Sequence, residues 1–312
     1  MTLSFFEPWI LISLAAATFQ TVRFMLQKQL ASGALSAAGA TYARFVYALP
    51  FLGVLMGLYL GQPGVDLPRI AGQFWIFATI GGSTQILATV CLMMLFTRRN
   101  FAVGVTFSKT EVIQTVLVGW LVLGDATSLV GIMAMMLGVV GLVLVSIKPE
   151  TVGWSLAGAW NPSAGLGLLS GLLFAFSGVS YRGASLAVMS SDPLLRAALT
   201  LMVVVSFQTV VMTCWLCVRE PAQIRAVWDA RRVAVWIGLT SMAGSFGWFL
   251  AFTLQVAAYV KAMGQVEVIL SLFATTLFFK EKISRREWLG IVILTVSIGV
   301  LILALSRQDP SR

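Results

Sequence analysis

Two acidic residues of this chain lie where acids are costly. Glu111 stands in the segment SKTEVIQTVL and Glu267 in GQVEVILSLF, each about ten residues into a stretch that is otherwise long and apolar. The chain has twelve acidic residues, and the others fall in connections, at the ends of apolar stretches or in the tails. An ionised carboxylate in the hydrocarbon of a bilayer is expensive unless it is shielded. Such a residue therefore indicates a solute or ion pathway, a proton relay or a buried ion pair.

Polar neighbours of the two acids recur at helical spacing. One face of the first stretch carries Ser108, Glu111, Gln114 and Thr115, and the matching face of the second carries Gly264, Glu267 and Ser271. We therefore expect both acids to face the interior of a helix bundle and to line or gate a central cavity. In the alternative, each acid holds helices together through a buried hydrogen bond or an ion pair, with Arg23, Arg44, Lys109 or Arg182 as its partner.

Other side chains with suitable chemistry lie in the same and further apolar stretches. Lys109 is two residues from Glu111, which places it about 200° away around a helix, so the two do not form a neighbouring pair. We expect Lys109 to complement a solute carboxylate or another helix instead. Arg44 and Arg196, early in their stretches, are expected to snorkel toward the membrane surface. Aromatic rings at helical spacing suit lipid contact or packing as well as a cavity. The candidate residues for solute binding or gating are Gln20, Gln85, Ser108, Lys109, Glu111, Tyr181, Trp248, Glu267 and Ser271.

The composition decides which elements position these side chains. Apolar residues make up 59% of the 312 residues, charged residues only 11%, and the mean hydropathy is +0.93. A water-soluble globule of this length needs more polar surface. Stretches of about 20 apolar residues, enough to cross about 30 Å of hydrocarbon, recur along the chain and are apolar on all faces, which predicts helices and not barrel strands. We predict an all-α integral membrane protein.

Ten membrane-spanning helices are predicted, joined mostly by short connections. They cover residues 8–30, 35–59, 73–96, 101–123, 127–147, 164–188, 194–218, 233–255, 257–279 and 286–306. Cys91, Cys214 and Cys217 all lie inside them, and because the chain has no histidine and no second cysteine pair we expect them to pack and not to bind a metal. No cofactor is expected, and the lack of a GxxxxGK[ST] segment argues against direct use of ATP.

Glycines predict where helices approach closely. Gly53, Gly57 and Gly61 make GxxxG steps in the second span, and Gly167 with Gly171 makes one in the sixth. We expect these steps to pack helices within one chain, which favours a monomer. Self-association into a dimer through the second span is the alternative.

The basic residues alternate between the two sides of the predicted bundle. The net charge is +9, and twelve basic residues fall in the first, third, fifth, seventh and ninth connections, against four on the opposite side. By the positive-inside rule the odd connections are cytoplasmic, so both termini lie outside a bacterial-type inner (plasma) membrane. The charge therefore reports topology, and no nucleic-acid partner is expected.

The chain repeats itself. A shift of 156 residues superposes the segment Glu111-Val112-Ile113 on Glu267-Val268-Ile269, and the junction VLGDATS on FFKEKIS. A shift of 157 superposes residues of the first and sixth spans. This predicts two five-helix halves, residues 1–150 and 151–312. Because five is odd, the second half enters the membrane from the opposite side, giving inverted repeats around a central cavity, a design typical of transporters.

These features resemble the drug/metabolite transporter superfamily, EamA type. The resemblance rests on ten helices as five plus five, on an acidic residue closing the fourth and ninth spans in VLGDATS and FFKEKIS, and on the glycine-containing helix after each. It covers essentially the whole chain and implies the branch that exports amino acids and related metabolites. Members are often drawn with cytoplasmic termini, whereas the charge distribution here places the termini outside.

The expected function is secondary transport and not an enzymatic reaction. The resemblance implies export of amino acids or related small metabolites by alternating access, and two carboxylates with basic, amide and aromatic groups suit a zwitterionic or cationic solute. Efflux of lipophilic cations and exchange of organic anions are alternatives within transport. A membrane-embedded enzyme or a lipid-handling scaffold is the alternative from another class. Uniport and proton antiport fit the sequence equally.

Overall fold

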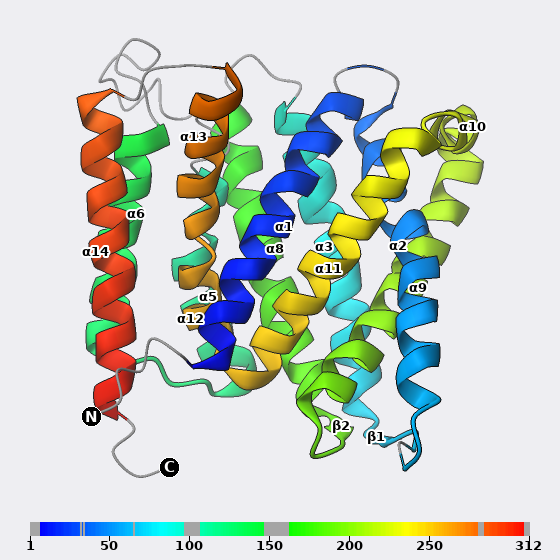
Figure 1. Ribbon diagram of the computed structural model, residues 1–312, viewed down its shortest axis with the longest axis horizontal. Helices are drawn as coiled ribbons and strands as arrows, with labels where there is room; N and C mark the ends of the chain where they lie inside the picture. The colour runs from blue at the N-terminus through cyan, green and yellow to red at the C-terminus, as the bar shows by residue number, and fades with distance from the viewer. Residues whose placement is uncertain are drawn as a thin grey trace.

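The structure, a computed structural model, describes residues 7–31, 33, 35–64, 66–96, 107–146, 162–279 and 284–308. Nearly all of these residues are helical, and the helices lie side by side in one bundle (Figure 1). Seven of the described helices are long and apolar enough to cross a membrane, and many of their large apolar side chains are exposed on the outside of the bundle. The prediction of an all-α membrane protein is thereby confirmed.

The helices are these. Residues 1–150 contain α1 (Pro8–Ala31), α2 (Ala37–Leu60), α3 (Gln73–Phe96), α5 (Glu111–Leu123) and α6 (Leu129–Ser146). Residues 151–312 contain α8 (Pro162–Leu186), α9 (Pro193–Arg219), α10 (Pro221–Asp229), α11 (Arg231–Leu254), α12 (Ala257–Met263), α13 (Val266–Phe279) and α14 (Arg285–Gln308). The seven long apolar helices are α1, α2, α3, α8, α9, α11 and α14, while α5 and α6 are shorter. The bounds lie within a few residues of the predicted spans, except around the two glutamates.

The connections lie at the two ends of the bundle. The short helix α10, which the sequence reading took as a connection, lies at one end. At the other end two-residue strands β1 (Arg69–Ile70) and β2 (Val188–Met189) pair antiparallel, with Arg69 opposite Met189. The first turn of α1 and the last turn of α14 also lie at that end (Figure 1). The charged connection around α10 is thus on the side opposite to both of these helix ends.

Helices far apart in the sequence pack against each other. The third long helix of each half lies along the first helix of the other half, because α3 packs on α8 and α11 packs on α1. The second helices, α2 and α9, contact each other, and so do the last helices, α6 and α14. The two halves are therefore interleaved, and most of the core is shared between them.

The second helix of each half begins at a side-chain cap that also reaches the other half. Ser36 caps α2 and Asp192 caps α9, each accepting a hydrogen bond from a backbone N–H of its own first turn. Ser36 also donates to the carboxylate of Glu220, and Asp192 accepts a hydrogen bond from the hydroxyl of Tyr59. The two caps are separated by the same offset of 156 residues that superposes the two glutamates.

Both helices that carry the candidate acids begin at or next to the acid. The helix α5 starts at Glu111, after a turn at residues 109–110. Glu267 lies in the first turn of α13, and Gly264 and Gln265 separate α13 from α12. The prediction of unbroken helices through both acids is therefore wrong. The free N–H groups and the positive end of the helix dipole favour a carboxylate in a first turn, which explains why the break falls there.

The glycine prediction for the second span is also wrong. Among the described residues, no atom outside its own turn would lie within 4 Å of a Cβ atom built on Gly53 or Gly57, and the neighbouring Val54 and Leu58 are 63% and 71% exposed. This face of α2 therefore points away from the described part of the bundle, and it does not pack against another described helix.

The helices α6 and α14 cross with their backbones close together. A Cβ atom on Gly290 would lie 2.7 Å from the carbonyl oxygen of Gly141, and one on Gly141 would lie 2.9 Å from the carbonyl oxygen of Gly290. The two backbones thus touch, and a side chain at either position would force them apart.

We expect Gly290→Leu to lower the thermal unfolding midpoint in detergent, because overpacking at this crossing costs about 1–3 kcal/mol. Gly299→Leu is the matched control in the same helix, since nothing lies within 4 Å of a Cβ built there. Equal midpoints for the two variants would show that the crossing at Gly290 does not contribute to stability.

Candidate functional site

A polar cavity lies inside the bundle, where the broken helices meet. It is bounded by α1, α2, α3, α8 and α11, by the turn before α5, and by the break between α12 and α13. Its empty space is about 890 Å³, counting the part that is open to solvent. The bounding elements come from residues 1–150 and from residues 151–312. Both halves of the chain therefore supply its walls.

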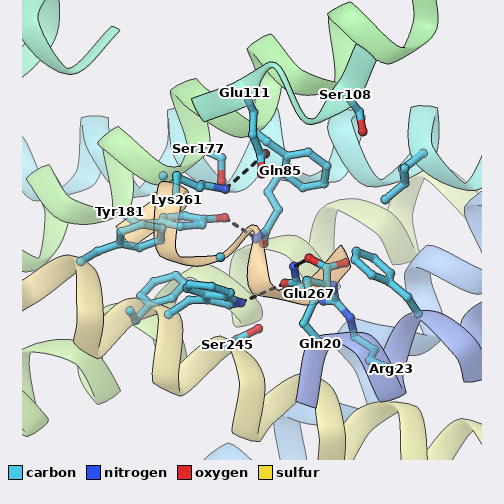
Figure 2. A pocket seen from close by; sticks show the side chains of 18 of the residues that line it. Gln20, Arg23, Gln85, Ser108, Glu111, Ser177, Tyr181, Ser245, Lys261 and Glu267 are labelled. Atoms are coloured by element: carbon cyan, nitrogen blue, oxygen red, sulfur yellow. Dashed lines mark hydrogen bonds and ion pairs between the residues drawn. The ribbon is translucent and has the colours of Figure 1, made fainter. Parts of the chain in front are cut away.

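Glu267 is the centre of one hydrogen-bond chain in this cavity. Its Oε2 lies 3.0 Å from Nζ of Lys109 and accepts a hydrogen bond of 2.8 Å from Nε2 of Gln20. The indole N–H of Trp248 in turn donates to Oε1 of Gln20 at 2.9 Å. The chain thus runs from α11 through α1 to α13, and Figure 2 shows Gln20 beside Glu267. Because every link is made, the carboxylate is held in one orientation.

Glu111 makes the second ion pair. Nζ of Lys261, on α12, lies 3.4 Å from its Oε2 (Figure 2). The same ammonium lies 5.4 Å from the ring centre of Phe174 and 5.9 Å from that of Phe252, distances at which aromatic faces attract a cation. Lys261 is thus placed between a carboxylate and two aromatic rings.

The two ion pairs are crossed between the halves. Lys109 of the first half pairs with Glu267 of the second, and Lys261 of the second half pairs with Glu111 of the first. All four side chains are at most 16% exposed. Since each pair bridges the two halves, any movement of one half against the other at this level must change both pairs.

Tyr181 belongs to a network of neutral groups on the wall. Its hydroxyl donates to Oε1 of Gln85 at 2.9 Å, and Nε2 of Gln208 donates to the same oxygen at 2.9 Å. The ring stacks on Phe249 with centroids 4.3 Å apart. Tyr181 and Gln85 therefore form a fixed wall between α8 and α3.

Two arginines also line the cavity. Arg23 is 3% exposed and Arg44 is 4% exposed. Nε of Arg44 donates to Ser241 at 3.0 Å, and its terminal nitrogens reach the hydroxyls of Ser245 at 3.3 Å and Thr89 at 3.4 Å. The prediction that Arg44 snorkels to the membrane surface is therefore wrong, because its guanidinium is turned inward onto three hydroxyl groups.

Most of the predicted site residues come together here. The residues found in the lining are Gln20, Gln85, Ser108, Lys109, Glu111, Tyr181, Trp248 and Glu267. Ser271 lies on α13, but its side chain is outside the part of the chain that the structure describes. That these residues bind or gate a solute stays a prediction. Of the partners considered for the acids, Lys109 pairs with Glu267, whereas Arg182 is bound to Asp125 at 3.0 Å.

The sequence reading missed Lys261, and it considered Arg23 and Arg44 inside the bundle only as possible partners of the two acids. Lys261 lies six residues before Glu267 inside a predicted span, so the argument from costly charges in hydrocarbon applies to it as much as to the glutamates. That argument could have found it. The pairing with Glu111 could not have been found, since it depends on how the halves interleave.

Close approach of backbones holds the turn before α5 against α8. A Cβ atom on Gly171 would lie 2.7 Å from the carbonyl oxygen of Ser108 and 3.3 Å from the backbone nitrogen of Glu111. Only glycine leaves room for this approach. The predicted packing role of Gly171 is confirmed, and its effect is to bring the start of α5 to the cavity wall.

Comparison with protein-family models and with curated proteins gives no match. The fold is similar to that of a solved crystal structure, with a TM-score of 0.69 and 15% sequence identity over 96% of this chain and 98% of the other chain. The description of that structure names no activity. A likeness at this identity shows the fold alone.

We expect the pair Glu111 and Lys261 to behave as a coupled unit. Glu111→Gln or Lys261→Met leaves the other charge without its partner, and each single change should lower the free energy of unfolding by about 1–3 kcal/mol. The double variant should lose less than the sum of the two single losses, because it leaves no orphaned charge. Thermal unfolding of the three purified variants measures this, and additive losses would mean that the pair is not coupled.

Proposed function

We propose that this protein is a secondary transporter that exports amino acids or related small metabolites across a bacterial-type inner membrane. The observation that carries the proposal is the polar cavity inside the bundle, built by both halves and bridged by two crossed ion pairs. A binding site at the junction of two similar halves is typical of transporters that expose one site alternately to each side of the membrane. The class of solute comes from the resemblance to the EamA-type exporters.

Several features support two inverted repeats of five membrane-spanning helices each. Residues 156 positions apart have the same local structure, since Glu111 and Glu267 lie in helix first turns and Ser36 and Asp192 are helix caps. The packing is reciprocal, with the first helix of each half on the third long helix of the other. Such an exchange is expected of two halves related by a twofold axis in the membrane plane.

The arrangement of the connections supports the predicted orientation. α1 begins and α14 ends at the same end of the bundle, as an even number of crossings requires (Figure 1). Arg219, Arg225, Arg231 and Arg232 surround α10 at the opposite end. By the positive-inside rule the α10 end faces the cytoplasm, and the termini face outward.

The broken helices support a solute site at this depth. A helix that stops inside the membrane leaves backbone N–H and C=O groups that need partners, and such breaks are tolerated where they line a cavity. The starts of α5 and α13 both meet the cavity. In the proposed cycle, rocking of one half against the other would rearrange the crossed ion pairs and so open the cavity to one side at a time.

Exchange of organic anions is the second candidate, and a specific observation favours it. The described residues that line the cavity include four basic side chains and two acidic ones. Efflux of lipophilic cations has less support, because each of the two carboxylates is within 3.4 Å of a lysine ammonium.

Counterflow in proteoliposomes tests the proposal. We expect saturable uptake of a labelled amino acid, with threonine, methionine and phenylalanine as the first solutes, and a quaternary dication as the comparison. Glu111→Gln and Glu267→Gln should each slow uptake about tenfold or more, because each leaves a buried lysine without its carboxylate, at a cost of about 1–3 kcal/mol.

Asp229→Asn is the control variant, since Asp229 is an exposed acid at the end of α10. It should transport at the rate of the unmodified protein. If neither these solutes nor an organic anion, with phenylacetate as the probe, shows saturable uptake into vesicles that contain folded protein, the transport proposal is wrong. A membrane-embedded enzyme or a lipid-handling scaffold then becomes the better hypothesis. Unchanged uptake in both glutamate variants would instead mean that the two acids hold helices together and take no part in transport.

A further inference from the structure

We propose that Arg23 and Arg44 form an anion subsite in the cavity, which binds the carboxylate of an organic solute that carries net negative charge. The inference rests on the proposed transport function, and it favours the second candidate solute named there, an organic anion, over a zwitterionic amino acid. It places the solute's anionic group at the α1–α2 side of the cavity, and its apolar part against the aromatic rings of α8 and α11.

The described lining of the cavity carries more positive than negative charge. The two glutamates of the lining are each paired with a lysine, at 3.0 Å and 3.4 Å. Among the described residues that line the cavity, this leaves the charges of Arg23 and Arg44 in excess, a surplus of two positive charges. A positive charge inside a membrane bundle is costly unless an anion accompanies it, so the charges of these lining residues favour an anionic partner.

Arg44 is held in place by groups that do not neutralise it. Its three guanidinium nitrogens contact three hydroxyl groups, on α11 and α3, at 3.0–3.4 Å. Within the described part of the chain, no carboxylate forms an ion pair with it. The guanidinium is therefore oriented in advance and keeps its full charge, as a recognition site for a planar oxyanion requires.

One donor of the Arg23 guanidinium has no acceptor within the described part of the chain. Its Nε is buried and bonds to no acceptor among the described residues, and the guanidinium lies 4.4 Å from the ring centre of Phe24. Glu267 attracts it, but Oε2 of that carboxylate already accepts hydrogen bonds from Lys109 and Gln20. Figure 2 shows Arg23 next to Glu267 and Gln20 at the cavity wall. An unsatisfied buried donor of this kind costs about 1–3 kcal/mol, which a bound carboxylate would recover.

The two guanidinium groups act on the same region. They line one cavity, and their positive charges repel each other. An anion between them relieves this repulsion, and the fork of an arginine matches the two oxygens of a carboxylate. Two arginines that share an oxyanion thus explain both the surplus charge and the orphaned Nε.

The remaining lining indicates an organic body for the solute. Aromatic rings dominate the other walls, among them Phe174, Phe249, Phe252 and Trp248. An apolar or aromatic group packs well on such rings, whereas inorganic phosphate would leave them in contact with water. The site therefore favours an organic carboxylate over a small inorganic anion.

Isothermal titration calorimetry on the full-length protein in detergent tests the subsite without requiring transport. The probes are phenylacetate, its neutral amide phenylacetamide, zwitterionic phenylalanine and inorganic phosphate. We expect the dissociation constant of phenylacetate to be lower than that of the amide by about tenfold or more, because only the carboxylate makes charge-assisted hydrogen bonds with both arginines. Phosphate should bind more weakly than phenylacetate.

Variants assign the effect to the two arginines. Arg23→Gln and Arg44→Gln should each weaken phenylacetate binding about tenfold while leaving phenylacetamide binding unchanged. Arg23→Lys keeps the charge and should recover part of the affinity, which also covers the case in which a neutral variant fails to fold. Arg231→Gln is the control, because Arg231 stacks on Trp228 at the end of the bundle, 5.5 Å from the ring centre, outside the cavity lining.

The outcomes separate this inference from the transport proposal. Binding that depends on both arginines supports the subsite even if no counterflow is seen, and in that case only the transport proposal fails. Equal affinity for phenylacetate and its amide overturns the subsite, as does binding unchanged in the folded arginine variants. Phosphate binding more tightly than every organic probe overturns the assignment of an organic solute. Counterflow of phenylalanine that ignores both arginines supports transport and overturns the subsite.

Discussion

The cost of charge in hydrocarbon is the constraint on which the rest of this structure depends. Six ionisable side chains from five helices and one turn meet in one cavity, where they shield one another from the surrounding apolar bundle. Neither half of the chain could satisfy its own acid, since each glutamate takes its lysine from the other half. The interleaved packing of α1 with α11 and of α3 with α8 is what brings these partners together. The charge pattern and the helix packing therefore determine each other.

Broken helices make this arrangement geometrically workable. A continuous helix buries its backbone groups and presents only side chains, whereas α5 and α13 each present a helix start with its acid in the first turn. The turn before α5 can reach the cavity because Gly171 lets α8 approach its backbone. The start of α5 thus stabilises the carboxylate of Glu111, and the same start is also where α8 needs a glycine in order to pack closely.

The sequence predicted the fold well and the site in part, for reasons that are physical. Apolar runs mark the helices because the bilayer demands about 20 apolar residues per crossing, and isolated acids in such runs are rare enough to indicate a cavity. The helix break at Gly264 and the outward face of Gly53 depend on neighbours that only the tertiary structure supplies. The inward turn of Arg44 likewise depends on three hydroxyls from two other helices. The periodicity of a sequence shows which face of a helix a residue lies on, but it does not show which other element that face contacts.

The lysines and the arginines of the cavity have different tasks in the proposed cycle. A lysine that already has its carboxylate gains little from a solute, but its pair bridges the halves and so responds to their relative position. An arginine that is held by neutral hydroxyl groups forms no ion pair between the halves. Its positive charge can therefore attract an anion. If a bound solute neutralises the two arginines, they no longer repel each other. Movement of one half against the other then costs less free energy with the solute bound than without it. Coupling of binding to movement then follows from the charge balance of one cavity, without a separate regulatory element.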